Sequence, residues 1–129
     1  MTGGLGFIGS NLVNALKKTH SIVVVDNNSS SREDWQELVK NNQNVEYVFS
    51  CYSEENMLCR IQGGEFDGIF PLAAIPRVLY SVENPVETTD TNILASVKLI
   101  DSAVKGKVKR FVFSSSSSVY GGADIMPTP

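Results

Sequence analysis

The chain is poor in the side chains that bind metals or form disulfide bonds. Its 129 residues include two cysteines, Cys51 and Cys59, and one histidine, His20. The cysteines match neither the Cys-x-x-Cys pattern of redox proteins nor the spacing of a zinc site, and one histidine leaves such a site short of ligands. We therefore expect no metal, and we expect both thiols to be reduced and buried as small apolar groups.

Long apolar runs and an excess of one charge sign are also absent. No hydrophobic stretch approaches the roughly 20 residues of a membrane span, and no basic-then-apolar leader precedes a cleavage site. The net charge of −3 and the 42% hydrophobic content are ordinary for a globular protein and suggest neither nucleic acid nor a membrane as partner. We expect one cytoplasmic domain over residues 1–129.

The most informative segment that is present is the glycine-rich stretch 2–9, TGGLGFIG. Its spaced glycines are Gly3, Gly6 and Gly9. They permit a tight turn and let backbone amides approach a pyrophosphate, and the helix that follows directs its positive end at the same charge.

An acidic residue, Asp26, ends the apolar run 22–25 and lies 17 residues after Gly9. At this position a carboxylate would bind the ribose hydroxyls of an adenosine. It would also repel a 2′-phosphate, so the pattern favours NAD over NADP. The alternative role of Asp26 is a simple cap at a strand end.

Helix-like and strand-like periods alternate along the chain. Helices are expected at 7–18, from 31 past Leu38, at 54–61 and at 85–104; strands are expected at 22–26, 45–49, 67–72 and 111–113. This alternation predicts an α/β fold with a Rossmann-type doubly wound parallel sheet. A glycine loop of this kind normally follows a buried strand, yet only Met1 precedes Thr2. We therefore expect the first, central strand and a C-terminal substrate-binding part to be missing from 1–129, and Met1 to be an internal start.

The sequence also predicts the N-caps of two of these helices and the apolar stripes of two. Ser31 with Asp34 is expected to cap the second helix, and Asn84 with Pro85 to open the long one. The stripe expected on the first helix consists of Ile8, Leu12 (or Val13) and Leu16. The stripe expected on the long helix consists of Ile93, Val97, Ile100 and Val104.

Five segments resemble the extended short-chain dehydrogenase/reductases, which include the NAD-dependent epimerases and dehydratases. Within that family they are most similar to the nucleotide-sugar 4-epimerases that act on UDP-glucose or UDP-N-acetylglucosamine. The segments are TGGLGFIG at 2–9, VVVDN at 23–27, FPLAAIPRV at 70–78, SVENP at 81–85 and KRFVFSSSSSVYG at 109–121. The resemblance implies a Rossmann fold, NAD as cofactor, a UDP-sugar as substrate of the full-length protein and a possible homodimer.

The resemblance also implies roles for individual residues. Phe7 and Ile8 would offer backbone amides to the pyrophosphate, and Asp26 with Asn27 would hold the adenosine ribose. Leu72, Ala73 and Ala74 would line the nicotinamide-ribose side, and Ser114 would also bind the cofactor. Ser116 would be the catalytic serine, which hydrogen-bonds the sugar hydroxyl. The alternative for the serine run is a low-complexity loop.

The chain also departs from the family pattern. The family's Tyr-x-x-x-Lys pair, in which the ammonium lowers the pKa of the phenol, is absent, because none of the four tyrosines has a lysine four residues later. Pro71 stands where the family usually has histidine, Cys51-Tyr52 replace an Asp-Ile pair that meets the adenine, and Ala95-Ser96 replace Gly-Thr. We therefore expect this polypeptide alone to be inactive.

Three functions follow from these residues. The first is the NAD-binding part of a UDP-sugar 4-epimerase. The second is the equivalent part of a nucleotide-sugar dehydratase or reductase, although the threonine and acidic pair typical of the dehydratases do not follow the serine strand. The third is a non-catalytic remnant that binds NAD weakly or not at all.

Overall fold

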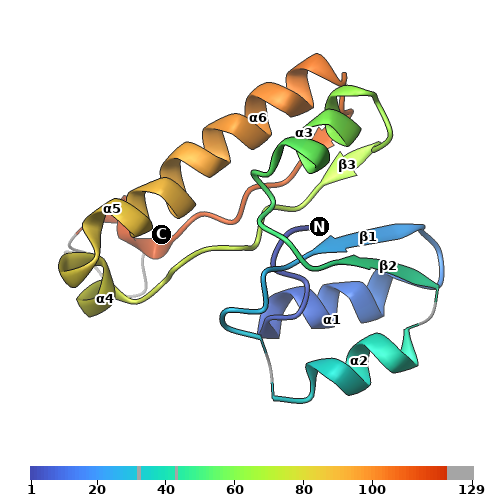
Figure 1. Cartoon of the computed structure of the whole chain (residues 1–129), viewed down its shortest axis with the longest axis horizontal. Helices are drawn as coiled ribbons and strands as arrows, with labels where there is room; N and C mark the ends of the chain where they lie inside the picture. Colours follow the sequence, from blue (N-terminus) through green and yellow to red (C-terminus); the bar gives the residue numbers. More distant parts are fainter. Residues whose placement is uncertain (32, 43, 122–129) are drawn as a thin grey trace.

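The computed structural model describes residues 1–31, 33–42 and 44–121 (Figure 1). Its helices are α1 (Phe7–Leu16), α2 (Trp35–Asn41), α3 (Glu55–Gln62), α4 (Val78–Glu83), α5 (Pro85–Thr89), the π turn η1 (Asp90–Leu94), α6 (Ala95–Lys105) and the 3-10 turn η2 (Ser117–Tyr120). Its strands are β1 (Ile22–Val25), β2 (Val45–Val48), β3 (Gly68–Ile69) and β4 (Arg110–Phe111). Within the described part, none of the helices is long and apolar enough to cross a membrane.

The strands form one parallel arrangement that is interrupted in the middle. β1 pairs with β2 and β3 pairs with β4, and the residues at the start of the chain lie between β1 and β3. Thr2 forms parallel bridges to Val25 on one side and to Pro71 on the other. The order across the molecule is therefore β2, β1, the stretch around Thr2, β3, β4. This order confirms the predicted Rossmann-type doubly wound topology.

The central position of this sheet is occupied only over its last residues. The Thr2 amide donates to Phe70 O at 3.0 Å and the Gly3 amide to Val25 O at 2.9 Å. The Met1 ammonium donates to Val23 O at 2.8 Å. A cavity of about 20 Å³ beside Met1 and Thr2 is lined mainly by apolar side chains of β1, β3, α3 and α6.

Two apolar layers cover the two faces of the strands, with α1 and α2 on one side and α3 and α6 on the other (Figure 1). Val24 packs with Val13 and Val45 under α1. The larger cluster on the other face consists of Val25, Tyr52, Met57, Ile61, Ile69, Ala95, Leu99 and Ala103. Successive strand residues point to opposite faces, so the continuous apolar run of β1 serves both layers, as predicted.

β3 and β4 are shorter than predicted, and Pro71 provides the reason. The ladder continues from the Val112 amide to Ile69 O at 3.0 Å. In this register the next bond toward β4 would need an amide at position 71. Proline has no backbone N–H, so the ladder ends there.

Two predicted caps are wrong in detail. α2 begins after Asp34, with no side-chain cap, and the Ser31 hydroxyl instead lies 3.5 Å from a carboxylate oxygen of Asp26. Asn84 does precede α5 and Pro85 does open it, but the Asn84 side chain donates backward to Tyr80 O at 3.3 Å. The cause is α4, a short helix that the sequence analysis did not predict and that ends where α5 begins.

The predicted apolar stripe of the first helix is confirmed in part, whereas that of the long helix is wrong. In α1 Val13 is buried and Leu12 and Leu16 are half-buried, while Ile8 is exposed. In α6 the buried residues are Ala95, Leu99, Ser102 and Ala103, and the predicted stripe is exposed along its whole length. α6 packs closely on α3 through small residues, and at Gly106 an added Cβ would lie 1.9 Å from Ile61 O. The buried face of α6 therefore consists of Leu99 and small residues, while Val97, Ile100 and Val104 lie at the surface.

Candidate functional site

A pocket of about 260 Å³ lies at the carboxyl ends of β1, β2 and β3. Its predicted members are Gly3, Gly6, Asp26, Asn27, Leu72, Ala73 and Ala74. Other residues that line it are Ser29, Ser30, Ser50, Cys51, Tyr52, Ile75, Pro76, Glu87 and Thr91. The fold thus brings the glycine loop, the acidic strand end and the end of β3 to one place, which is where open α/β sheets bind ligands.

The glycine loop approaches the end of β3 more closely than any side chain would permit. Gly3 has a φ of +66°, and an added Cβ there would lie 2.7 Å from the Ala73 amide nitrogen. An added Cβ at Gly9 would lie 2.2 Å from Gly3 O. Gly6 differs, because its nearest neighbour would be Gly3 O at 3.4 Å, an ordinary contact. The protein's own packing requires Gly3 and Gly9, whereas at Gly6 the missing side chain leaves room in the pocket.

α1 starts directly after this loop, with Gly6 as its N-cap and no side-chain cap. The first turn therefore directs backbone N–H groups and the positive end of the helix dipole toward the loop. Phe7 and Ile8 begin the helix, but their side chains are exposed and they are not among the residues that line the pocket.

Asp26 connects the strand end to the loop. One carboxylate oxygen accepts the Leu5 amide at 2.9 Å, and the other accepts the Asn28 amide at 2.9 Å. The second bond is the strand-end cap considered as the alternative role, and it coexists with a place in the pocket lining. The carboxylate is partly buried. The oxygen that accepts the Leu5 amide has a second lone pair for another donor, whereas the other oxygen also lies 3.5 Å from the Ser31 hydroxyl.

The opposite wall follows β3 and is held by Thr2. The Thr2 hydroxyl accepts the amides of Leu72 and Ala73, both at 3.1 Å. Farther along, the Asn92 side chain accepts the Ile75 amide at 2.8 Å and donates to Ile75 O at 2.9 Å. The sequence analysis assigned no role to Thr2 or Asn92; Thr2 opens the glycine motif, but no sequence signal connects Asn92 with Ile75.

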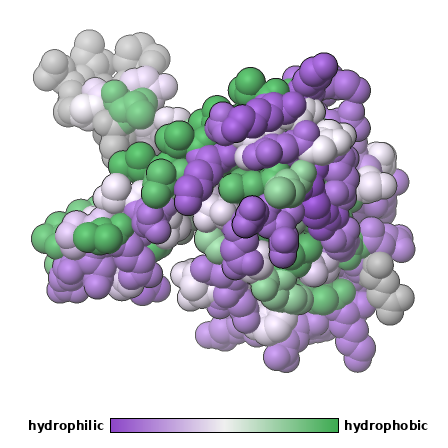
Figure 2. Space-filling model, turned by 45° about the horizontal axis from the view of Figure 1, so that its top comes forward, coloured by the Kyte–Doolittle hydropathy of each residue, from purple (hydrophilic) through white to green (hydrophobic). Residues whose placement is uncertain are grey.

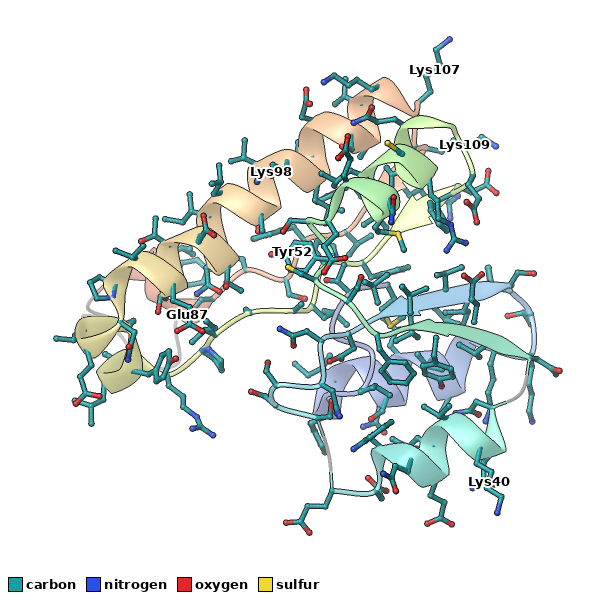
Figure 3. All side chains as sticks on the ribbon, in the orientation of Figure 1. Lys40, Tyr52, Glu87, Lys98, Lys107 and Lys109 are labelled. Carbon is teal, nitrogen blue, oxygen red and sulfur yellow. The ribbon has the colours of Figure 1, made fainter. Side chains whose placement is uncertain are left out.

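The third wall is the loop after β2, where Cys51 and Tyr52 line the pocket. Cys51 is half-buried, as expected of a small apolar group, but Cys59 is exposed, contrary to expectation. Tyr52 is buried, and its hydroxyl donates to Thr91 O at 2.6 Å. Figure 3 shows Tyr52 near the middle of the molecule, beside the helical segment that leads into α6.

Ser114 and Ser116 do not reach the pocket. They follow β4 as exposed residues and do not line it. The backbone oxygen of Ser116 accepts the Val119 amide at 3.1 Å, where the η2 turn begins. In residues 1–31, 33–42 and 44–121 no group of three or more His, Cys, Asp or Glu side chains could hold a metal ion.

A glycine loop packed against a strand end, an uncapped helix N-terminus and a carboxylate at the next strand end together define a dinucleotide-binding α/β domain. Comparison with protein-family models agrees, because residues 1–128 match the NAD dependent epimerase/dehydratase family. The chain belongs to that family.

Within this family, the chain is similar to individual enzymes that are named for UDP-sugars. The chain is 32% identical to the bifunctional UDP-glucose 4-epimerase and UDP-xylose 4-epimerase 1 of Pisum sativum, over 98% of the chain and 39% of the relative. It is 33% identical to a UDP-N-acetyl-alpha-D-glucosaminuronate decarboxylase of Bacillus cytotoxicus, over 94% of the chain and 37% of the relative. A UDP-glucose-4-epimerase of Stenotrophomonas maltophila, solved with bound NAD and formylated UDP-arabinopyranose, matches with a TM-score of 0.85 and 29% identity, over 98% of the chain and 39% of that structure. The chain thus spans about two-fifths of the length of these proteins.

Proposed function

We propose that this chain binds NAD in the pocket between the glycine loop, Asp26 and the strand end 72–74. The observation that carries the proposal is the Gly3–Ala73 approach, with 2.7 Å from an added Cβ to the Ala73 nitrogen, beside an uncapped helix N-terminus. Such a loop brings backbone N–H groups close to a pyrophosphate. The S. maltophila relative, which has this fold, was solved with NAD bound.

Each wall would hold one part of the dinucleotide. The amides at the start of α1, including those of Phe7 and Ile8, would bind the pyrophosphate, and Asp26 with Asn27 would accept the adenosine ribose hydroxyls. Leu72, Ala73 and Ala74 would line the nicotinamide side. NAD supplies hydride transfer when it is bound, while the chain supplies orientation and charge.

A titration with two loop variants tests this proposal. We expect saturable NAD binding by calorimetry, and Asp26→Asn should weaken it by about tenfold or more, because the charged acceptor is lost. Gly6→Ala should weaken it similarly while leaving the unfolding midpoint nearly unchanged, since an added Cβ there clashes with nothing in the protein. Absence of saturable binding by the unsubstituted chain would show that it is a non-binding remnant.

For the whole protein, we infer NAD-dependent 4-epimerisation of a UDP-sugar, with Ser116 as the catalytic serine. The relative from P. sativum is named for this reaction. The B. cytotoxicus relative is named for a decarboxylation, so another nucleotide-sugar reaction is the second candidate. The 129 residues alone contain no Tyr-x-x-x-Lys pair, and we expect no conversion of UDP-glucose by the purified chain.

A homodimer in the cytoplasm completes the proposal. The apolar stripe of α6 and the neighbouring turn η1 is exposed: Ile93, Val97, Ile100 and Val104. Figure 2 shows further hydrophobic side chains on the part of the molecule that projects to the left, where Figure 1 places α4 and α5. A surface of this kind is typical of a protein interface, and sedimentation of the chain with and without Val97→Asp would detect a dimer and its loss.

A further inference from the structure

The loop between β2 and α3 is attached to the helical segment on the far side of the pocket by one side chain. The ring of Tyr52 is 4% exposed and packs in the same cluster as Met57 and Leu99. Its hydroxyl donates to Thr91 O at 2.6 Å, across 39 positions of sequence. Both residues line the pocket.

The π turn leaves the acceptor of this bond, Thr91 O, without its helical donor. In a regular α-helix the Ala95 amide would donate to Thr91 O, four residues earlier. Here it donates to Asp90 O, because η1 adds one residue to the turn. The Thr91 carbonyl therefore lacks its usual helical donor, and the Tyr52 hydroxyl donates to it instead.

The residue after Thr91 holds the opposite wall. Asn92 bonds both backbone groups of Ile75, at 2.8 and 2.9 Å. Thr91 and Asn92, two consecutive residues of one turn, thus contact two different loops. Among the described residues, no hydrogen bond joins these two loops directly. One loop follows β2 and contains Cys51 and Tyr52, and the other follows β3 and contains Ala74 and Ile75.

We propose that Tyr52 is a positioning residue for the dinucleotide, whose hydroxyl latches the loop after β2 to the π turn and so fixes its distance from the loop after β3. The inference rests on the proposed NAD site, in which the first loop faces the adenosine and the second the nicotinamide side. NAD must contact both walls at once, whereas a ligand as short as AMP contacts only the first. The latch therefore contributes to NAD binding by ordering the walls before the ligand arrives.

The chemistry of Tyr52 suits a permanent donor. Burial raises the pKa of its phenol, so the hydroxyl keeps its proton at neutral pH. The nearby Ser96 side chain is a smaller, opposing cause, which lowers the pKa of this phenol. Tyr52 and Ser96 both stand where the chain departs from the family pattern, so the two departures meet at this contact.

Hydrogen exchange in the ligand-free protein tests the latch directly. Tyr52→Phe removes only the hydroxyl, and we expect the Ile75 amide to exchange about fivefold faster or more, as for one lost buried hydrogen bond. Tyr47→Phe is the matched control, because the Tyr47 hydroxyl accepts from Asn42 away from the pocket. In an Asn92→Ala background, Tyr52→Phe should add little, since Ile75 is already released. Unchanged Ile75 exchange in Tyr52→Phe overturns the latch.

Ligand binding then separates positioning from general destabilisation. For Tyr52→Phe we expect the NAD dissociation constant to rise about three- to tenfold and that of AMP less than twofold, with Tyr47→Phe unchanged in both. Equal losses for NAD and AMP, or no loss for either, overturn the positioning role. If the unsubstituted chain does not bind NAD, the proposed function is wrong, and the Ile75 exchange result alone decides the latch.

Discussion

β1 and β2 pair over four residues each, whereas β3 and β4 pair over only two. In the first half of the sheet, backbone hydrogen bonds continue to the edge of the pocket, where the Asp26 amide donates to Val48 O at 3.1 Å. In the second half Pro71 ends the ladder toward β4. On its other side the Leu72 amide still donates to Thr2 O at 3.2 Å, and the side chains of Thr2 and Asn92 hold Ala73 and Ile75. The proline thus removes ladder bonds toward β4, and the side-chain contacts that help to hold the strand end can be removed by single substitutions.

The largest expected loss of stability comes from a substitution in the glycine loop, which belongs to the first half of the molecule. In Gly9→Ala the new Cβ would lie 2.2 Å from Gly3 O and 2.6 Å from the Gly4 Cα, and both neighbours are backbone atoms. We expect the free energy of unfolding to fall by more than about 3 kcal/mol. Urea denaturation measures this, with Gly6→Ala as the control in the same loop. Similar losses for the two variants would contradict the assignment of Gly9 to packing and Gly6 to the pocket.

The next effect concerns the second half, where α6 covers β3. Leu99 is 1% exposed in the larger cluster, whereas its neighbour Ile100 is 45% exposed. Leu99→Ala should cost about 3 kcal/mol through lost burial and a residual cavity, and Ile100→Ala less than about 1 kcal/mol. Thermal and urea unfolding measure both. A larger loss of stability in Ile100→Ala than in Leu99→Ala would show that the apolar stripe predicted from the sequence faces the core after all.

The pH dependence of the free energy of unfolding tests the burial of the Met1 amino group, which lies between the two halves of the sheet. In a polypeptide with a free amino group at Met1, burial lowers the pKa of that group from 8.0 to about 6. Between these values the unfolded chain binds more protons, so stability rises with pH from 6 to 8 and is lost as the pH falls. We expect a change of about 2–3 kcal/mol, measured by urea unfolding at pH 5.5 and 8.5.

Two controls identify the group responsible for that change. The step should persist in His20→Asn, which removes the one histidine, and it should disappear when the amino terminus is acetylated. A step that follows His20 instead would contradict the burial of the amino group.

The smallest expected effect comes from removing the Thr2 hydroxyl, which joins the two halves of the sheet. Thr2→Val keeps the shape but leaves the Ala73 amide without its acceptor, and we expect a loss of about 1–2 kcal/mol together with faster exchange of that amide. Thr89→Val is the control, because Thr89 is an exposed residue of α5. Equal losses for the two variants would show that the Thr2 hydroxyl does not hold the strand end.

The amino-acid sequence predicted the first half of the molecule better than the second. The apolar run 22–25 and the glycines before α1 are local patterns, and the strand, the helix start and the pocket lining by Gly3 and Asp26 agree with them. α4 was missed, because its six residues, Val78–Glu83, are too few to show a helical period. Ser114 and Ser116 follow a predicted strand, yet both are exposed and neither lines the pocket.

By itself, the sequence determined the α/β class and the parallel sheet, because periodicity and glycine spacing act within a few residues of one another. Its five motif segments carried the resemblance to the family. Only the tertiary structure decided which face of α6 is buried and where β3 ends. It also decided which atoms join the pocket walls, as at Tyr52 and Thr91. These outcomes depend on distances between segments far apart in the sequence: α6 must approach α3 closely enough for small residues, and a π turn must free one carbonyl for a distant hydroxyl.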